Sequence, residues 1–291
     1  MTSRIVPPIS VSVNRPAVPG PVVVSVPHAG RIYPPEILAA ARVDRCVLER
    51  LEDRWCDRIA ADAHDAGASV VAALWARAVA DCNRGEGQMA PAEVAPTLRP
   101  QFAAPGRKER AGLGVVPTRL ADHGPLWKQP IDRAALEWRL DRLHRPYHDA
   151  LAGEIAAARQ RFGFAILVDL HSMPAIPPGQ PGHGTRIVIG DRFGATAAES
   201  LVDLAMASAS ALGEPVQRNQ PYAGGHVVRT HGRPGDGVHA IQIEIDRSLY
   251  LTAERMPDAE RVARLARWFA ALVSEAGQWR PDADLLPQAA E

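Results

Sequence analysis

Two histidines stand directly after hydrophobic, β-branched runs that predict buried strands. His28 follows residues 22–26, and His171 lies just beyond residues 164–168. Ligands of open α/β sheets bind beyond the carboxyl ends of the strands, so both imidazoles stand where a site is expected. Neutral imidazole suits zinc, and three protein ligands leave a position for water, whose pKa the metal lowers to about 7. The two histidines therefore indicate a metal site, with a hydrogen-bonded pair of core histidines as the alternative.

The third ligand of such a site is expected to be a carboxylate. Glu52, Asp53 and Asp57 are the candidates near the first histidine, and they lie in a segment with helical spacing, residues 44–66, that ends at Gly67. Periodicity alone does not choose among the three carboxylates.

Donor groups follow the second predicted strand, residues 68–74. The segment Asp81-Cys82-Asn83-Arg84 places an amide beside a guanidinium. Arginine binds carboxylates through two parallel hydrogen bonds, so this segment indicates an anion-binding function. The alternative is a turn that uses asparagine for its backbone tolerance.

A carboxylate also interrupts the last predicted strand, residues 238–245. Glu244 points to the opposite face of this strand from its neighbours Ile243 and Ile245. A carboxylate in so apolar a strand is either paired structurally or a general base. The turn-rich segment 219–226 is a further place where backbone can approach a ligand closely.

Other histidines lie on predicted helices or loops and have no acidic neighbour at a strand end. We interpret these five as surface or structural residues: His64, His123, His144, His148 and His183.

Strands alternate with helices along the chain, which predicts an α/β fold with a mostly parallel or mixed central sheet and helices on both faces. Further strands are expected at 186–189 and helices at 131–161, 194–212 and 252–276. We expect one domain, residues 21–280, with an extended N-terminal arm (1–20) and a C-terminal tail (281–291). Residues 85–130 are rich in Pro and Gly and are expected to be an insertion that borders the site, with a disordered surface insertion as the alternative.

Composition narrows the class of protein. The 291 residues carry 33 Lys and Arg against 33 Asp and Glu, and 46% are hydrophobic, which predicts a globular protein and argues against a nucleic-acid binder. No apolar run approaches the roughly 20 residues of a membrane helix, and no signal peptide is recognised. Cys46, Cys56 and Cys82 show no CxxC spacing, so we expect free thiols and a cytoplasmic location. No glycine-rich phosphate-binding motif follows the first strand, which argues against a nucleotide-binding protein.

Six short motifs resemble, in the same order, those of the N-formylglutamate amidohydrolases. They extend over about residues 20 to 275 and are Val26-Pro27-His28-Ala29-Gly30, Asp53, Asp81-Cys82-Asn83-Arg84, Asp169-Leu170-His171-Ser172, Tyr222-Ala223-Gly224-Gly225-His226 and Gln242-Ile243-Glu244. That family is similar in fold to the zinc carboxypeptidases and to the succinylglutamate desuccinylase and aspartoacylase group. The chain departs from the family's Asp-Thr-Asp-Trp type of segment, which is Glu52-Asp53-Arg54-Trp55 here.

The resemblance implies a role for each matching position. One zinc ion would be held by His28, Asp53 and His171, with Asp169 either orienting His171 or structural. Asn83 and Arg84 would bind a substrate carboxylate, with Arg77 assisting, and Glu244 would be the general base and then the acid.

The implied activity is hydrolysis of the amide of a small-molecule N-acyl amino acid, above all N-formyl-L-glutamate to formate and glutamate, as in histidine degradation. The alternatives are a zinc carboxypeptidase, an N-acyl amino acid deacylase of other specificity, and a non-catalytic binding module of the same fold. Neither a nucleic acid nor a membrane is expected as a partner.

Overall fold

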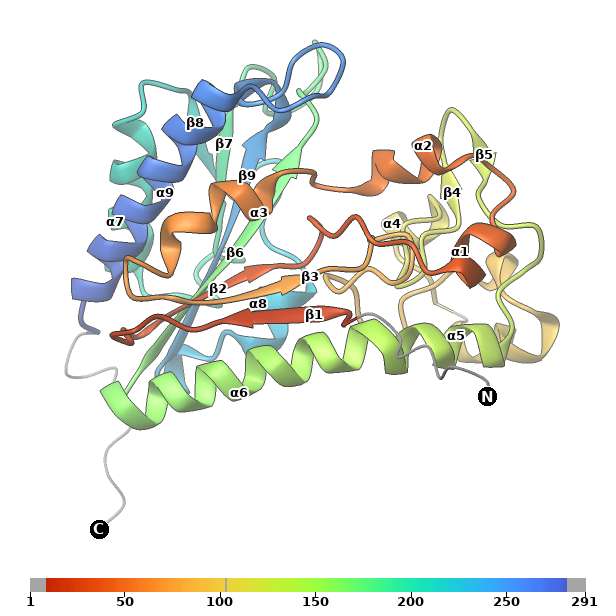
Figure 1. Ribbon diagram of the computed structural model, residues 1–291, viewed down its shortest axis with the longest axis horizontal. Helices are drawn as coiled ribbons and strands as arrows, with labels where there is room; N and C mark the ends of the chain where they lie inside the picture. Colours follow the sequence, from red (N-terminus) through yellow and green to blue (C-terminus); the bar gives the residue numbers. More distant parts are fainter. Residues whose placement is uncertain (1–8, 103, 282–291) are drawn as a thin grey trace, which may run out of the picture.

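The computed structural model describes residues 9–102 and 104–281. Its centre is a seven-stranded mixed sheet with the strand order β1-β3-β2-β6-β9-β7-β8 (Figure 1). The four central strands run parallel, whereas β1 is antiparallel to β3 and β7 is antiparallel to β9. The strands are β1 (Val11–Asn14), β2 (Val22–Val26), β3 (Ser69–Ala73), β6 (Ala165–Met173), β7 (Ile187–Gly190), β8 (Val216–Arg218) and β9 (Val238–Asp246).

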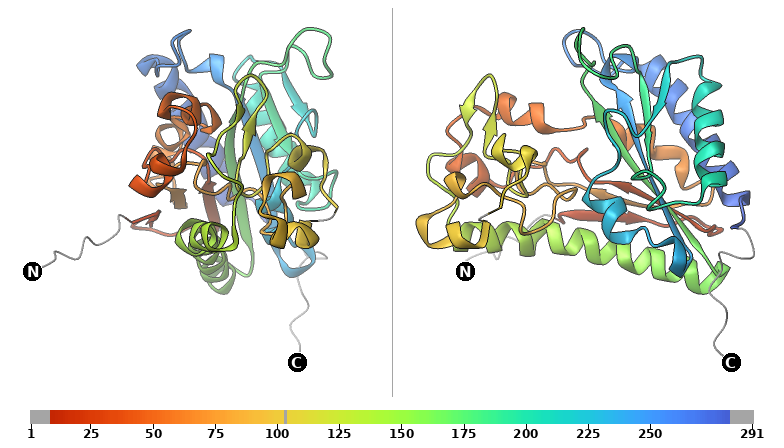
Figure 2. Two further views of the ribbon diagram at one scale, coloured as in Figure 1. Left: turned by 90° about the vertical axis from the view of Figure 1, so that its right-hand side faces the viewer. Right: turned by 180° about the vertical axis from the view of Figure 1, so that it is seen from behind.

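Helices cover both faces of this sheet, as the alternation of elements predicts (Figure 2). The helices are α1 (Pro35–Ala40), α2 (Arg45–Leu48), α3 (Cys56–Ile59), α4 (Arg107–Arg110), α5 (Arg133–Arg139), α6 (Arg145–Phe162), α7 (Glu199–Ser210), α8 (His226–His231) and α9 (Ala259–Gln278). Helices α6 and α8 pack on one face, and α3, α7 and α9 pack on the other. The predicted fold class is therefore confirmed.

The central strands are buried on both sides because their apolar residues are continuous rather than alternating. In β2, Val23 joins the core under α6, whereas Val22 and Val24 join the core under α9. In β6, Leu167 joins the core under α6, and Ile166 joins the core under α9. These strands form a rigid platform for the side chains at their carboxyl ends.

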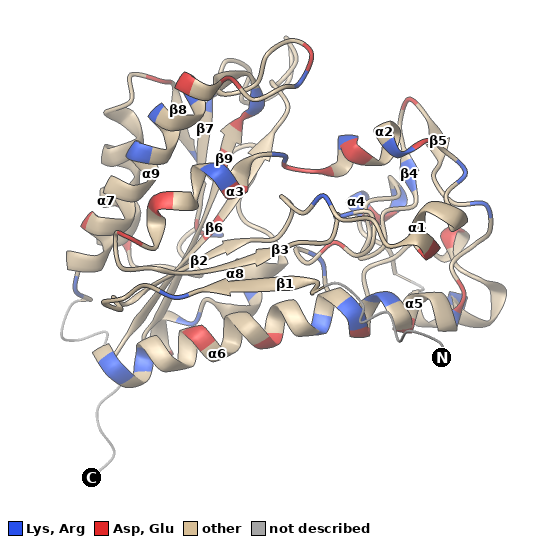
Figure 3. Ribbon diagram, viewed as in Figure 1, with Lys and Arg blue, Asp and Glu red and all other residues tan. Residues whose placement is uncertain are grey.

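Capping residues that are recognisable in the sequence set the end of α6 and the start of α9. Gly163 terminates α6 with φ 82°, a left-handed conformation that glycine adopts without steric cost. Asp258 precedes α9, and its carboxylate accepts a hydrogen bond from the backbone N–H of Arg261 at 3.1 Å. Helix α6 contains both basic and acidic residues along its length (Figure 3). A π-helical turn, Leu140–His144, connects α5 to α6.

The helix expected over residues 44–66 is wrong as a single element. The chain forms α2, leaves helical geometry at residues 52–55, and resumes as α3. Trp55 has φ 73°, and the backbone N–H of Asp53 donates a 2.9 Å hydrogen bond to the carbonyl of His28. A continuous helix would direct that N–H along its own axis, so the break is what brings Asp53 to the end of β2.

The described residues of 85–130 form only short regular elements. They are two 3-10 helices (Pro91–Glu93 and Pro96–Phe102), α4, and the two-stranded hairpin of β4 (Arg119–Leu120) and β5 (Gly124–Pro125). Their apolar residues nevertheless belong to the core under α6, since Leu98, Val115 and Leu126 are fully buried. The alternative of a disordered surface insertion is therefore wrong for the part of this segment that the structure describes.

The chain ends are described only in part. Within the expected arm, residues 11–14 form the edge strand β1, while residues 1–8 and most of the expected tail, 282–291, lie outside the described residues. None of the helices in the described ranges combines the length and apolarity needed to cross a bilayer. Cys46, Cys56 and Cys82 are all free thiols in the structure.

Candidate active site

Three side chains from distant parts of the sequence converge at the carboxyl ends of β2 and β6. Nδ1 of His28 lies 3.3 Å from Oδ2 of Asp53, and Nδ1 of His171 lies 3.1 Å from the same oxygen. The two imidazole rings are 4.7 Å apart between centroids, and all three residues are buried. The structure thus groups the two histidines with Asp53 rather than with Glu52 or Asp57.

The turn after β2 aims His28 toward this point because it lies against the segment that follows β3. A Cβ atom at Gly30 would stand 2.1 Å from the carbonyl oxygen of Trp75, so only glycine fits there. On the neighbouring strand, β6 extends through Met173, beyond the end predicted from the sequence, so that Asp169 and His171 lie within the strand.

The outer nitrogens of both imidazoles are held by buried carboxylates. Nε2 of His28 lies 2.7 Å from Oδ1 of Asp81, and Nε2 of His171 lies 2.8 Å from Oδ2 of Asp169. A carboxylate only accepts hydrogen bonds, so each Nε2 carries a proton. In the neutral form of each ring, the form that binds a metal, Nδ1 has a lone pair directed at Asp53; in the protonated form, Nδ1 donates to Asp53 instead. Metal-ligating histidines have this orientation, with the second nitrogen donating to a carboxylate.

Further contacts fix these two carboxylates. The Arg77 guanidinium donates to Oδ2 of Asp81 from Nε at 2.9 Å and from Nη2 at 2.6 Å. Ser25 on β2 donates to Oδ1 of Asp169 at 2.6 Å. Although burial acts in the opposite sense, the Arg77 and His28 charges hold the pKa of Asp81 well below its usual value. Both carboxylates are therefore fixed in the positions where they accept from the imidazoles.

The electrostatics of the three converging groups favour a cation between them. Two nitrogen lone pairs and a carboxylate oxygen repel one another unless a proton or a metal ion lies among them. The pKa of His171 is raised well above its usual value, because the charge of Asp169 and bonds to Asp169 and Asp53 outweigh burial. The nitrogen and oxygen donor set fits a divalent transition metal such as zinc.

Glu244 lies on the strand next to His171. Parallel pairing of β6 and β9 sets His171 opposite Glu244 and Asp169 opposite Gln242. Because side chains alternate along a strand, all four lie on the same face of the sheet. Nε2 of Gln242 donates to Oε1 of Glu244 at 2.9 Å. Burial raises the pKa of Glu244 to about 7, despite the opposing charge of His171.

A cavity of about 310 Å³ is lined by His28, Asp53, His171, Gln242 and Glu244. Four cationic side chains line it: Arg77, Arg84, Lys108 and Arg247. An anionic substrate is favoured by such a lining. Lys108 comes from α4, so the 85–130 segment contributes to the cavity wall.

The structure refines the predicted donors Asn83, Arg84 and Arg77. Oδ1 of Asn83 accepts from the backbone N–H of Val227 at 2.9 Å, and its Nδ2 donates to Gln242 Oε1 at 3.2 Å. Arg84 donates to the carbonyl of Asn83 through Nη1 at 2.7 Å and keeps its place in the cavity wall. Arg77 also lines the cavity, although much of its guanidinium is engaged by Asp81.

Sequence reasoning missed three contributors to the site. Asp81 received no role, although it stands in a motif that we singled out. Lys108 lies in the irregular insertion, where no periodicity signals orientation. Arg247 follows β9 and donates to Oδ1 of Asp53, and only the fold shows that contact.

Comparisons with known proteins show which family this chain resembles along most of its length. The profile described as N-formylglutamate amidohydrolase matches residues 20–251. An N-formylglutamate deformylase of Pseudomonas putida is 31% identical over 239 residues, covering 79% of this chain and 82% of its own length. A deformylase of the same name from Pseudomonas aeruginosa is 30% identical over 259 residues, covering 88% and 90%.

Solved structures show the same relationship. The crystal structure of N-formylglutamate amidohydrolase from Ralstonia eutropha JMP134 superimposes with a TM-score of 0.84 at 30% identity, over 93% of this chain and 98% of that one. A protein from Agrobacterium tumefaciens shares the fold with a TM-score of 0.61 at 22% identity, over 92% and 94%. The order of the motifs, the extent of the matching profile and the curated relatives lead to one assignment. The chain belongs to the N-formylglutamate amidohydrolase family.

Proposed function

We propose that this protein is a metal-dependent hydrolase that cleaves N-formyl-L-glutamate to formate and glutamate, with one zinc ion held by His28, Asp53 and His171. The observation that carries the proposal is the convergence of both Nδ1 atoms on Oδ2 of Asp53 within a cavity that also contains Glu244. The substrate is inferred from the names of the relatives, which are N-formylglutamate deformylases.

The proposed ligand atoms are Nδ1 of His28, Nδ1 of His171 and a carboxylate oxygen of Asp53. A divalent ion bound there supplies Lewis acidity toward the amide carbonyl and toward water. Asp81 and Asp169 keep the two imidazoles in the tautomer whose Nδ1 is free to bind.

Glu244 is the proposed general base. Its carboxylate takes a proton from the attacking water and returns it to the nitrogen of the departing amine, so that the amide C–N bond breaks with the net addition of one water. Gln242 restricts this carboxylate through the 2.9 Å hydrogen bond to Oε1. The carboxylate must stay in one place because it takes the proton from the water that attacks the amide carbon and delivers it to the nitrogen bonded to that carbon.

Arg84 and Lys108 are the proposed anchors for the carboxylates of the substrate, with Asn83 completing the wall between them and His171. Arginine and lysine bind carboxylates through charge-assisted hydrogen bonds, which are stronger than neutral ones. Anchoring the amino acid at a distance from the metal ligands holds the scissile amide beside Glu244.

The test is a formate-release assay on protein that has been stripped of metal and then reloaded with zinc. Activity on N-formyl-L-glutamate that disappears on stripping and returns with zinc is the expected result. N-acetyl- and N-succinyl-amino acids and a C-terminal peptide substrate serve as the comparison panel. Faster turnover of a panel member would assign a deacylase of other specificity or a carboxypeptidase, and full activity without metal would refute the metal dependence.

A further inference from the structure

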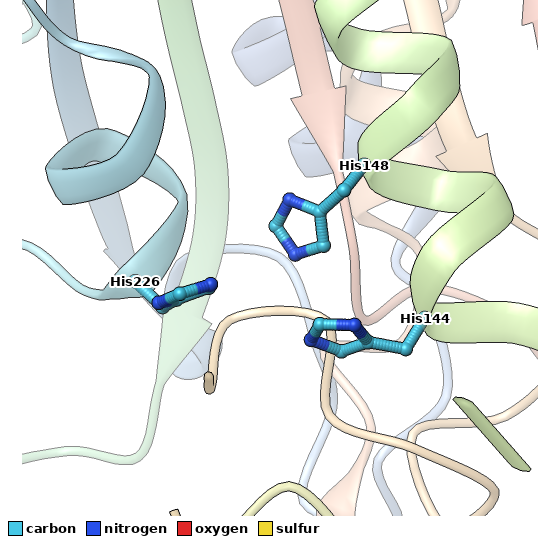
Figure 4. A group of neighbouring side chains, drawn as sticks. All are labelled: His144, His148 and His226. Carbon is cyan, nitrogen blue, oxygen red and sulfur yellow. The ribbon is translucent and has the colours of Figure 1, made fainter. Parts of the chain in front are cut away.

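A second cluster of histidines lies beside the segment that supplies Asn83 and Arg84. His144 ends the π-helical turn, His148 is one turn further along α6, and His226 begins α8. His144 and His148 project from consecutive turns of one continuous helix toward His226, which comes from α8 (Figure 4). One ring nitrogen from each residue lies within 4.8 Å of the others, and the centroids of His144 and His148 are 4.6 Å apart.

All three histidines bind the backbone of one short segment. Its carbonyl oxygens, which only accept, receive hydrogen bonds from two imidazole N–H groups and one backbone N–H. The bonds run from His148 Nε2 to Cys82 O at 2.9 Å, from His226 N to Asn83 O at 3.4 Å, and from His144 Nε2 to Arg84 O at 2.7 Å. The cluster therefore connects α6 and α8 through residues 82–84.

His144 has a nitrogen without a partner. Because Nε2 donates to a carbonyl, Nδ1 keeps its lone pair, and among the described residues this atom makes no hydrogen bond. The side chain is only 4% exposed, and a buried acceptor without a partner costs free energy. An imidazole that donates from one nitrogen to a backbone carbonyl and presents the other as a lone pair has the orientation of a metal ligand. A carboxylate oxygen of Glu86 lies 3.9 Å from this Nδ1 and provides negative charge nearby.

The other two imidazoles have partners that an ion can replace. Nδ1 of His148 accepts from His231 at 3.0 Å, and Nδ1 of His226 accepts from Arg229 at 3.0 Å. Thr230 Oγ1 lies 3.3 Å from both ring nitrogens of His226. Once Arg229 is displaced, Nδ1 can instead carry a proton and donate it to Thr230 Oγ1, which leaves Nε2 as a ligand.

We propose that His144, His148 and His226 form a second site for a divalent transition-metal ion, separate from the one at His28, Asp53 and His171. Imidazole ligands select zinc, copper or nickel over calcium and magnesium. An ion held by these three rings ties α6 and α8 to the segment that forms one wall of the active-site cavity, so it stabilises the fold there rather than joining the reaction. This proposal does not rest on the hydrolytic function proposed above.

The first test counts zinc in wild-type protein and in His226→Gln. Stripped protein is reloaded with zinc, freed of excess by gel filtration and analysed by mass spectrometry, and zinc binding is followed by calorimetry. Wild type is expected to bind one zinc more than His226→Gln, or to bind its second zinc at least tenfold more tightly. The matched control is His64→Gln, which removes an imidazole bonded to the carbonyl of Ala61 and is expected to match wild type. Equal stoichiometry and affinity in wild type and His226→Gln would overturn the proposal.

The second test uses unaltered protein and so is independent of how any variant folds. Crystals of the wild type grown with zinc are measured at the zinc absorption edge. An anomalous peak among the three rings is expected whether or not the site at Asp53 is filled. A peak beside Asp53 with none at the histidine cluster would refute the second site and leave the proposed hydrolase intact, whereas the reverse pattern would refute the catalytic metal alone.

Discussion

Arg247 donates a 2.7 Å hydrogen bond from Nη2 to Oδ1 of Asp53, the carboxylate oxygen that does not face the two histidines. Nε of Arg247 also donates to Ser172 Oγ at 3.1 Å, so the guanidinium is fixed on both sides. Although burial acts against ionisation, bonds from His171 and His28 and the charge of Arg247 hold the pKa of Asp53 well below its usual value. The arginine thus orients the carboxylate and leaves Oδ2 directed at the imidazoles.

Replacing this arginine should weaken metal binding without removing a ligand. Arg247→Leu is expected to lower zinc affinity by about 10–100-fold, the usual effect of losing a group that orients a ligand. Arg247→Lys retains the charge and should recover part of the loss. Competition with a chelator measures the affinity, and Arg264→Leu, an exposed arginine near Glu214, is the control. Unchanged affinity in Arg247→Leu would show that Asp53 needs no such support.

Asp81→Asn should affect both metal affinity and stability. The substitution removes the carboxylate that fixes His28 and leaves the charge of Arg77 buried and unpaired. Breaking a buried ion pair on one side costs about 3–5 kcal/mol in the free energy of unfolding. Urea unfolding of the metal-free protein measures that loss.

A double variant separates these two effects. Arg77→Gln with Asp81→Asn removes the unpaired charge, so unfolding stability should largely return while zinc affinity stays low. Recovery of both quantities would mean that the Asp81 carboxylate is needed only as the partner of Arg77 and does not orient His28.

Gly225→Ala should disturb the cavity wall while preserving the fold. A Cβ atom at residue 225 would lie 2.2 Å from Oδ1 of Asn83, and the N–H of Gly225 donates to Gln242 at 2.7 Å. Asn83 must therefore move, and we expect kcat/KM to fall by roughly tenfold or more, because small misplacements of positioning groups are costly. Gly153→Ala is the control: it lies in α6 with nothing within 4 Å, and it should stabilise the protein by about 0.5–1 kcal/mol. Normal kinetics in Gly225→Ala would contradict the role of Asn83.

Strong local patterns account for the parts of this structure that were predictable from the sequence. The apolar runs of β2 and β9 identify their strands, and the residues that follow or interrupt these runs, His28 and Glu244, line the cavity. Neighbouring parallel strands end at the same edge, which is why short motifs far apart in sequence meet there.

Positions that depend on tertiary contacts were harder to predict from the sequence. Apolar residues at helical spacing continue through residues 52–55, and only the hydrogen bond from Asp53 to the His28 carbonyl explains why the helix breaks there. The sequence predicts only a surface or structural role for His144 and does not predict that it lies beside His226. His226 begins a different helix, α8, within a segment that reads as turns. Spacing along one segment carries no information about such neighbours.

Lys108→Gln should raise KM for N-formyl-L-glutamate with little change in kcat. Lys108 lines the cavity, so the variant loses an attraction for a carboxylate that is present in both the bound substrate and the transition state. About tenfold in KM is expected, equivalent to about 1.4 kcal/mol. Lys128→Gln is the control, because its ammonium donates to the carbonyl of Ala39 outside the cavity. A lower kcat at unchanged KM would instead place Lys108 in the chemical step.

The pH dependence of the reaction tests the assignment of the base directly. A general base works in its ionised form, and burial raises the pKa of Glu244 to about 7 in the metal-free protein. Activity should therefore be complete above this pKa and fall about tenfold per pH unit below it. A bound cation favours the carboxylate, which moves the acid limb of the zinc enzyme to the same or a lower pH.

Glu244→Gln removes that titrating group while retaining a side chain of the same shape. We expect it to bind zinc normally, to lose about 10²–10⁴-fold in kcat, and to lose the acid limb from its residual activity. Zinc content, kcat and the pH profile of kcat/KM are measured on the same preparation as the wild type. A variant that loses activity but keeps the limb would show that the limb belongs to another group, and near-wild-type turnover would remove Glu244 from the mechanism. The pH profile is decisive because a merely structural carboxylate, paired with Gln242, would change the rate without abolishing the titration.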